Sequence, residues 1–479
     1  MVFSSLLFLY VFLAANLLCY ALVKSLAVRN AIMLVFSLVF YAWGEPKYVL
    51  LLLFMTFADW LFALCIGRVQ GTPRARLWLV LACVVNLGLL GVFKYGTFFL
   101  ENTHALLGVP SVIPQIALPI GISFYTFQLL SYVVDVYRGE VAPQRRYHML
   151  LLYASLFHQC IAGPIVRYQD VASELLMRRT NIGEIGRGIT RFAVGLGKKA
   201  LFANVCGAVS EQLLPTSLDP AQIASSPALA VWGSMLAYML QIYLDFSAYS
   251  DMAIGMGQMI GFHYKENFDY PYLSRTVSEF WRRWHISLGT FFRDYVYIPL
   301  GGNRRGKLRT YWNLFVVWFL TGFWHGASWN FMLWGLYFFV FIAIERLFLR
   351  RWLEKLPGFV SHVYLLLVVF FGWILFRFQD LSTVWLVFKG LFGLNGNPWS
   401  SFSVKTTLLN YVFLLAAAIL ACTPLVKRLG QAWKRQAAGH VLSARVYVAV
   451  QAVVPALLLL LSTMLLVGDS YNPFLYFQF

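Results

Sequence analysis

Apolar runs long enough to cross a lipid bilayer recur along this chain from one end to the other. A hydrocarbon core about 30 Å thick is spanned by roughly 20 apolar residues in helical form. Hydrophobic residues make up 60% of the 479 positions and charged residues only 12%, which leaves too little polar surface to cover a water-soluble globule. Because a helix satisfies its own backbone hydrogen bonds in lipid, the sequence predicts an all-α polytopic membrane protein with one domain, residues 1–479.

The loops between the apolar runs predict how the chain is threaded. Lys and Arg gather in the cytoplasmic loops of most membrane proteins, so the net charge of +18 is explained by topology and requires no nucleic acid. The first run is expected to be a retained span rather than a cleaved signal peptide, with the N-terminus outside the inner (plasma) membrane. The expected spans are residues 3–23, 31–43, 48–66, 77–100, 116–136, 200–214, 228–244 with 252–260 as a candidate extension, 360–376, 407–426 and 446–467.

Two further apolar stretches are expected to enter and leave the membrane on the same side. Residues 149–166 end at Gly163 and Pro164, which break a helix, and Arg residues follow. Residues 311–344 lie between two basic segments and are interrupted at residues 321–326. Non-helical backbone at membrane depth must be surrounded by protein or by a water-filled cavity. With these re-entrant hairpins, the chain is predicted to have ten to eleven transmembrane helices.

The densest group of polar residues lies between residues 279 and 305. Its arginines flank a Gly-Gly-Asn turn, and such an arrangement suits a phosphorylated ligand because guanidinium forks match phosphate oxygens. A lipid-headgroup anchor at the inner face is the alternative explanation of the same charges. The candidate donor-binding residues are Arg282, Arg283, Arg293, Asp294, Asn303 and Arg304.

A histidine within an apolar stretch is the strongest candidate for chemistry. His325 follows Trp324 at the interruption of residues 311–344. Imidazole takes and returns a proton near neutral pH, and a buried neutral histidine suits a general base. A lone buried histidine is more often a satisfied core residue, but a helix break opposite a basic site favours function. Trp324, Asp251 and Tyr249 are candidate pocket residues, and the six dispersed cysteines predict neither a disulfide nor a metal site.

Three motifs resemble the hallmark region of the membrane-bound O-acyltransferase family. They are WRRWHIS at 281–287, RDYVYIPLGGN at 293–303 and LTGFWHGA at 320–327, all within residues 279–327 and in the family's order. The bacterial branch that contains alginate O-acetyltransferases is the most similar. Support for that branch extends to MVFSS at 1–5, LPIGISFY at 118–125, AGP at 162–164 and DFSAYSDMAIG at 245–255.

The resemblance implies a membrane-bound O-acetyltransferase with His325 as the essential histidine and His285 as the second marked polar position. It implies no bound cofactor, a cytoplasmic thioester donor such as acetyl-CoA, and transfer through the membrane to an exported polysaccharide, alginate-like or other. A periplasmic hydrolase-like acetyltransferase is the alternative acceptor and a partner. Two other functions remain open: transfer of D-alanine or another acyl group from a carrier, as in the teichoic-acid branch, and transport of a polysaccharide precursor, since buried Asp and His also line transport paths.

Overall fold

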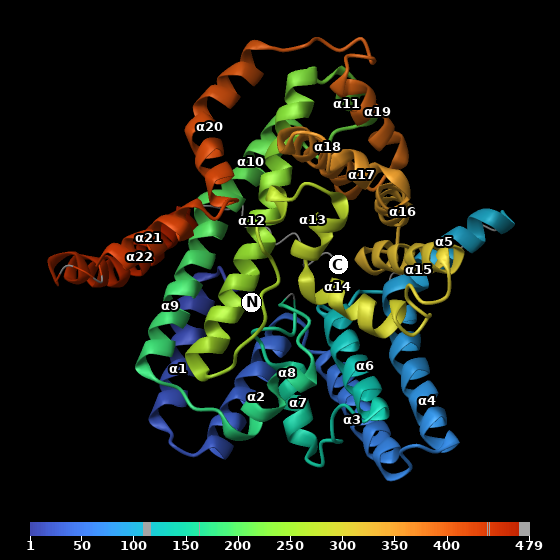
Figure 1. Cartoon of the computed structure of the whole chain (residues 1–479), viewed down its shortest axis with the longest axis vertical. Coiled ribbons are helices and arrows are strands. Elements are labelled where there is room, and N and C mark those ends of the chain that lie inside the picture. The colour runs from blue at the N-terminus through green and yellow to red at the C-terminus, as the bar shows by residue number, and fades with distance from the viewer. Residues whose placement is uncertain (109–115, 162, 438, 440, 469–479) are drawn as a thin grey trace.

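The computed structural model describes residues 1–108, 116–161, 163–437, 439 and 441–468, and this part of the chain contains helices and no β-strand. Figure 1 shows the long helix α12 (Ala228–Ile260) running through the middle of the molecule, with α13 (Val277–Arg283) and α14 (Ile286–Phe292) beside it at the centre. The N-terminal helices lie below, and α18 (Gly358–Arg377) lies above them in this view. The fold is therefore all-α, as predicted.

Nine segments of the described residues are long and apolar enough to cross a membrane. The chain is a multi-pass membrane protein, but a count of ten to eleven spans is not confirmed. Residues Phe8–Leu22 form too short an apolar helix, and α6 (Ile122–Arg138) has only 17 residues, because the expected span from residue 116 begins in non-helical backbone. The nine candidates are Leu26–Gly44 (α2), Val49–Arg68 (α3), Pro73–Leu107 (α4, η2, α5), Ile182–Leu213 (α9, η3, α10), Ala228–Ile260 (α12), Trp329–Leu353 (α16, η6, α17), Gly358–Arg377 (α18), Phe402–Ala421 (α20) and Val441–Gly468 (α22).

The helix that contains residues 200–214 begins much earlier than predicted, at Ile182. Its first part is α9 (Ile182–Gly197), which has charged residues on one face and buried residues on the other. The charged residues made the segment look like a loop in the sequence, but its glycines approach α12 closely. A Cβ atom on Gly188 would lie 2.7 Å from the main-chain oxygen of Gly255, and one on Gly195 would lie 2.8 Å from that of Ala248. Small residues permit such close helix packing in membranes, so α9 is a packing element rather than a loop. The candidate extension of the next span to residue 260 is confirmed by α12.

The segment 149–166 does not form a helix long enough to span the membrane, and its re-entrant course stays a prediction. Its helix, α7 (Tyr147–Ser155), has nine residues and is followed by buried turns and extended backbone. Two side chains supply hydrogen bonds to main-chain oxygens there: the Tyr153 hydroxyl donates to Val166 (2.8 Å), and the Gln159 amide donates to Tyr153 (2.7 Å). Protein groups thus satisfy backbone that helix formation leaves unpaired.

The stretch 311–344 forms the expected helical hairpin from α15 (Lys307–His325) and α16 (Trp329–Ile344). The break lies at residues 326–328 rather than 321–326, so Thr321 and Gly322 are helical and the predicted position was wrong. Gly322 serves close packing instead of ending the helix. A Cβ atom on Gly322 would lie 2.3 Å from the Phe331 main-chain oxygen, and one on Gly335 would lie 2.3 Å from that of Trp318.

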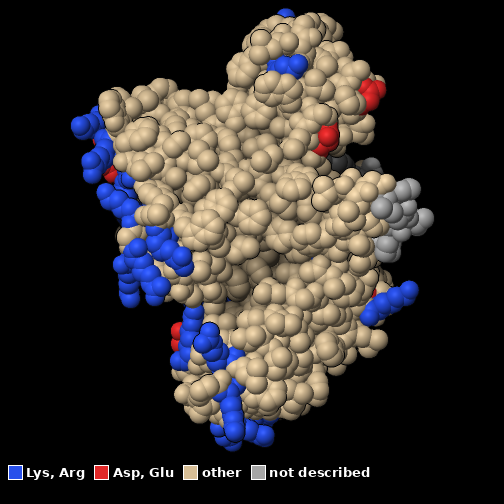
Figure 2. All heavy atoms as spheres, turned by 90° about the vertical axis from the view of Figure 1, so that its right-hand side faces the viewer, with Lys and Arg blue, Asp and Glu red and all other residues tan. Residues whose placement is uncertain are grey.

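An apolar pocket opens on the side of the molecule that lies at the right of Figure 1. The face seen in Figure 2 is largely uncharged and is hollowed near its centre, while Lys and Arg gather along one edge. The pocket has a volume of about 420 Å³ and is lined by α4 (Pro73–Leu90), α6, α14 and α15, with Trp324 among its lining residues. The hydrophobic surface of this pocket therefore reaches the end of α15.

We predict that Gly335→Ala separates the two helices of the hairpin. The new methyl group must displace main-chain atoms, and overpacking of this kind typically costs about 1–3 kcal/mol. The control is Gly88→Ala on α4, where a Cβ atom would meet no other atom within 4 Å and alanine has the higher helix propensity. The melting temperature of each purified variant in one detergent measures the effect, and equal melting temperatures would contradict the close contact.

Candidate active site

His325 is the last residue of α15, and its imidazole is buried among aromatic rings. The ring centroids of Trp324 and Trp334 lie 4.9 Å from that of His325, and that of Phe376 on α18 lies 5.2 Å away. Burial in such surroundings disfavours the charged imidazolium. A neutral imidazole can accept a proton at one of its ring nitrogens.

His285 occupies the turn between α13 and α14 and has an unusual backbone conformation. Its φ angle is +45°, in the left-handed region that residues with a side chain rarely adopt. The turn is held by neighbours, because Trp284 is buried and the Ile286 amide donates to the main-chain oxygen of Asn267 at 3.0 Å. Strained positions that the surroundings maintain are frequent at functional sites, and this one buries the His285 side chain.

Asn267 determines how His285 carries its proton. The Oδ1 atom of this buried asparagine lies 3.2 Å from His285 Nδ1 and also accepts hydrogen bonds from the Ser287 amide and hydroxyl. Because Oδ1 can only accept, Nδ1 of His285 is the donor and the neutral ring presents an acceptor at Nε2. This tautomer suits orientation of a substrate N–H or O–H group better than polarisation of a carbonyl. Sequence reasoning missed Asn267, which lies outside every motif.

Trp324 brings the two histidines into one site. The centroid of its ring lies 5.9 Å from that of His285 and 4.9 Å from that of His325. Forty residues of chain separate the two histidines, yet α14 and α15 place both against the same indole. The structure therefore unites His285, Trp324 and His325, three of the residues that the sequence marked.

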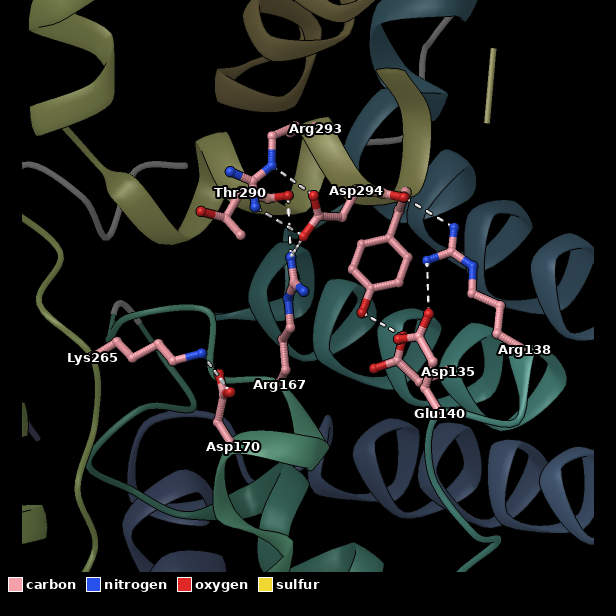
Figure 3. A network of polar contacts seen from close by, with 10 residues as sticks. Asp135, Arg138, Glu140, Arg167, Asp170, Lys265, Thr290, Arg293 and Asp294 are labelled. Carbon is pink, nitrogen blue, oxygen red and sulfur yellow. Dashed lines mark hydrogen bonds and ion pairs between the residues drawn. The ribbon is translucent and has the colours of Figure 1, made fainter. Parts of the chain in front are cut away.

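The predicted arginine cluster divides into separate groups. Arg293 and Asp294 begin the π-helical turn η5 (Arg293–Tyr297), where Arg167 donates to Asp294 Oδ2 at 2.5 Å and Arg293 donates to Oδ1 at 2.6 Å. Figure 3 shows both guanidinium groups directed at this carboxylate. Burial opposes ionisation of Asp294, but the hydrogen bonds from Arg293 and Arg167 outweigh it and hold the pKa of the carboxyl below its usual value. Asp294 is therefore ionised at neutral pH and is the counter-ion of these arginines.

The other predicted donor-binding residues lie elsewhere. Arg282 donates to the Ser278 main-chain oxygen of its own helix, and Arg283 pairs with Glu279 at 2.8 Å. Asn303 is exposed and accepts hydrogen bonds from Tyr297 and Arg346, and Arg304 is exposed beside it. Within the part of the chain that the structure describes, none of these four residues forms a hydrogen bond or an ion pair with Asp294.

A polar pocket adjoins Asp294 and contains two arginines that sequence reasoning used only for topology. Its volume is about 550 Å³, and Arg138, Glu140, Arg167, Asp294, Ile298 and Pro299 line it. Arg138 donates to the Asp294 main-chain oxygen at 2.9 Å and lies 3.8 Å from Glu140. Both arginines follow apolar runs, so the signal that could have found them is their position at the ends of two neighbouring segments.

Tyr249 and Asp251, both on α12, contact different neighbours. Asp251 accepts from Arg191 at 2.9 Å and from Lys198 at 2.7 Å, both on the α9 side. The Tyr249 ring stacks on Phe3 with centroids 4.5 Å apart. These contacts join α12 to its neighbours, and the assignment of both residues to the substrate pocket stays a prediction.

Comparison with known proteins identifies the class to which this site belongs. A model of the membrane-bound O-acyltransferase family matches residues 146–388, which include both histidines. The chain is 38% identical over 507 aligned positions to a probable alginate O-acetylase of Azotobacter vinelandii, with all of both chains covered. The chain therefore belongs to the membrane-bound O-acyltransferase family and is an acyltransferase.

Two other relatives are named for different activities. A peptidoglycan O-acetyltransferase of Helicobacter pylori is 33% identical, and the alignment covers 83% of this chain and 80% of that protein. A teichoic acid D-alanyltransferase of Bacillus subtilis is 26% identical, over 55% of this chain and 68% of that protein. The similarity to O-acetyltransferases is thus higher and more extensive than the similarity to the D-alanyltransferase.

We predict that Asn267→Ala lowers acyl transfer by roughly 10- to 100-fold, because a group that orients a catalytic residue is lost. Loss of Oδ1 removes the acceptor that sets the tautomer and orientation of His285. The matched control is Asn86→Ala, since Asn86 is equally buried but binds Asp59 between α3 and α4. The measurement is the activity of each variant per folded molecule after size-exclusion chromatography. Equal activities of Asn267→Ala and Asn86→Ala would show that Asn267 has no special role.

Proposed function

We propose that this protein is an O-acetyltransferase of the inner membrane, with its N-terminus outside, that moves an acetyl group from a cytoplasmic thioester, acetyl-CoA, to a hydroxyl group beyond the membrane. The acceptor is an alginate-like or other exported polysaccharide, or a periplasmic acetyltransferase partner that passes the group on. The observation that carries the proposal is the pair of buried histidines in contact with Trp324 at the break of the α15–α16 hairpin. Full-length similarity to a probable alginate O-acetylase supports the acetyl group and the acceptor class.

In the proposed reaction His325 acts as the general base. Its neutral imidazole removes the proton from the acceptor hydroxyl as that oxygen attacks the thioester carbonyl carbon. The C–S bond then breaks, the acetyl ester forms, and the proton passes from His325 to the departing thiolate. Such proton transfer typically contributes about 10² to 10⁴ in rate. No serine nucleophile is required, because the thioester is already activated.

His285 has a different role in this proposal. Its Nδ1–H is held by Asn267, so Nε2 is the ring atom that can accept a hydrogen bond from a donor group of the substrate. It orients the thioester arm or the acceptor hydroxyl rather than withdrawing charge from the carbonyl. The left-handed backbone of His285 keeps this atom in the buried site.

The phosphates of the donor bind, in this proposal, at the polar pocket beside Asp294. Arg138 and Arg167 line it, and Arg293 lies at its margin with a largely exposed side chain. Arginine forks match phosphate oxygens. Neither Arg282 nor Arg283 lines this pocket, which makes the α13 arginines the weaker candidates.

A D-alanyltransferase is the second candidate, because the Bacillus subtilis relative carries that activity in its name. Purified protein in vesicles distinguishes the two functions. Labelled acetyl-CoA should yield an acetylated acceptor, and unlabelled acetyl-CoA should compete while a D-alanyl carrier thioester should not. Competition by the D-alanyl donor alone would favour the second candidate.

We predict that His325→Gln abolishes acetyl transfer, with a loss of about 10² to 10⁴ expected for a general base. The matched control is His158→Gln, because His158 is also buried but contacts Phe157 and Tyr264. Both variants are inserted into vesicles and supplied with labelled acetyl-CoA. Undiminished transfer by His325→Gln would refute the role assigned to His325.

We predict that Arg138→Gln raises the KM for acetyl-CoA severalfold and leaves kcat nearly unchanged, as expected when uniform binding is lost. Arg282→Gln, on the exposed side of α13, should leave both constants unchanged. Steady-state kinetics with varied acetyl-CoA measure the effect. A raised KM in Arg282→Gln alone would place the donor at the α13 arginines instead.

A further inference from the structure

The end of α15 lies inside the protein, where its carbonyl groups need partners. The last four carbonyl groups of an α-helix have no intrahelical donor. In α15 these belong to residues 322–325, and the chain continues in extended backbone at Gly326. Water is excluded from this region, because Trp324 and His325 are each 2% exposed. The position of His325 therefore depends on side chains that bind these carbonyl groups.

Two consecutive residues of another helix supply donors to two of these four carbonyl groups. Lys94 Nζ donates to the Trp324 main-chain oxygen, and the Tyr95 hydroxyl donates to that of Phe323 at 2.7 Å. The Tyr95 ring also stacks on Phe323, with centroids 3.8 Å apart and planes inclined by 7°. Both residues belong to the π-helical turn η2 (Gly91–Tyr95) between α4 and α5. π-Helical turns are frequent at functional sites.

The amino group of Lys94 lies at unusual depth for a basic side chain. The residue is 8% exposed, and none of the ion pairs found among the described residues includes it. Its other contacts are a hydrogen bond of 3.0 Å to Ser123 at the start of α6 and the face of the Trp324 ring, 5.4 Å away. A buried cation is costly, and the negative end of the α15 dipole offsets part of that cost. A neutral side chain could cap the helix without the desolvation penalty of a charge.

We propose that Lys94, assisted by Tyr95, is a positioning residue that holds the last turn of α15 and thereby keeps His325 aligned with the reacting atoms. The inference rests on the proposed function of His325 as general base. Lys94 joins Trp324 to Ser123 and so ties the end of α15 to the start of α6, while Tyr95 binds the adjacent carbonyl. Lys94 also contacts the face of the Trp324 ring, which in turn contacts both histidines.

The test compares Lys94→Met, Lys94→Arg and Tyr95→Phe with His325→Gln in vesicles supplied with labelled acetyl-CoA. Displacement of a catalytic group by about 1 Å can cost up to ~10² in rate, so Lys94→Met should lower kcat at least tenfold. The KM for acetyl-CoA should stay within twofold, because the donor phosphates bind elsewhere. Lys94→Arg should restore part of kcat, since it keeps the charge and the N–H donors. Tyr95→Phe keeps the stacked ring, loses one hydrogen bond and should show a smaller decrease in kcat.

The outcomes separate this inference from the proposed function. Wild-type kcat in Lys94→Met, or equal losses in Lys94→Met and Lys94→Arg, would overturn the positioning role while His325→Gln remained inactive. Full activity of His325→Gln would refute the proposed function itself. If Lys94→Met does not accumulate in the membrane, Lys94→Arg and Tyr95→Phe decide: wild-type kcat in both overturns the inference, and a graded decrease supports it.

Discussion

The arrangement of the site depends on how a helix ends inside the protein. The carbonyl groups at the end of α15 need hydrogen-bond donors, and Lys94 and Tyr95 supply two of them from a helix that precedes α15 by more than two hundred residues. The close contact of Gly322 with Gly335 then fixes α16 against α15. Trp334 of α16 packs on His325 as a result. Capping, close packing and enclosure of the imidazole are thus consequences of one buried helix terminus.

Hydrophobic runs predicted most of the spans because a helix that contacts lipid must consist largely of apolar residues. Runs such as α2, α3 and α18 were found with boundaries displaced by only a few residues. The prediction of spans failed for a helix that packs against another helix rather than against lipid. α9 carries Glu184, Arg187 and Arg191, which indicated a loop, but its glycines face α12 and its charges bind partners such as Asp251. In the hairpin, Gly322 indicated a helix break, whereas it permits helices to approach each other.

The histidines were predictable because an imidazole in an apolar stretch is chemically exceptional, and both lie in motifs that resemble a family. The residues that position these histidines were not predictable from the sequence. Asn267 is an ordinary polar residue until the fold brings it to His285. Lys94 was recognisable as a charge in an apolar run, but nothing in its neighbourhood along the chain indicates Trp324 as its partner. The arginines of residues 282–304 form one cluster in sequence and several in space, because α13 and η5 project them in different directions and pair them with different carboxylates.

Two buried lysines of this fold, Lys94 and Lys199, lie where the helix geometry changes locally. Besides Lys94 and Tyr95 on η2, the consecutive residues Lys198 and Lys199 lie on the π-helical turn η3 (Lys198–Ala203) and bind Asp251 and Asp245 of α12, each at 2.7 Å. In a regular α-helix, neighbours in sequence point about 100° apart, which makes it difficult for both to reach one adjacent helix. A π-helical turn changes this spacing within a single turn. Both turns lie within long apolar segments whose average character is that of a span. At Lys94 and at Lys199 the helix departs from its regular period, and no hydrophobic pattern records that departure.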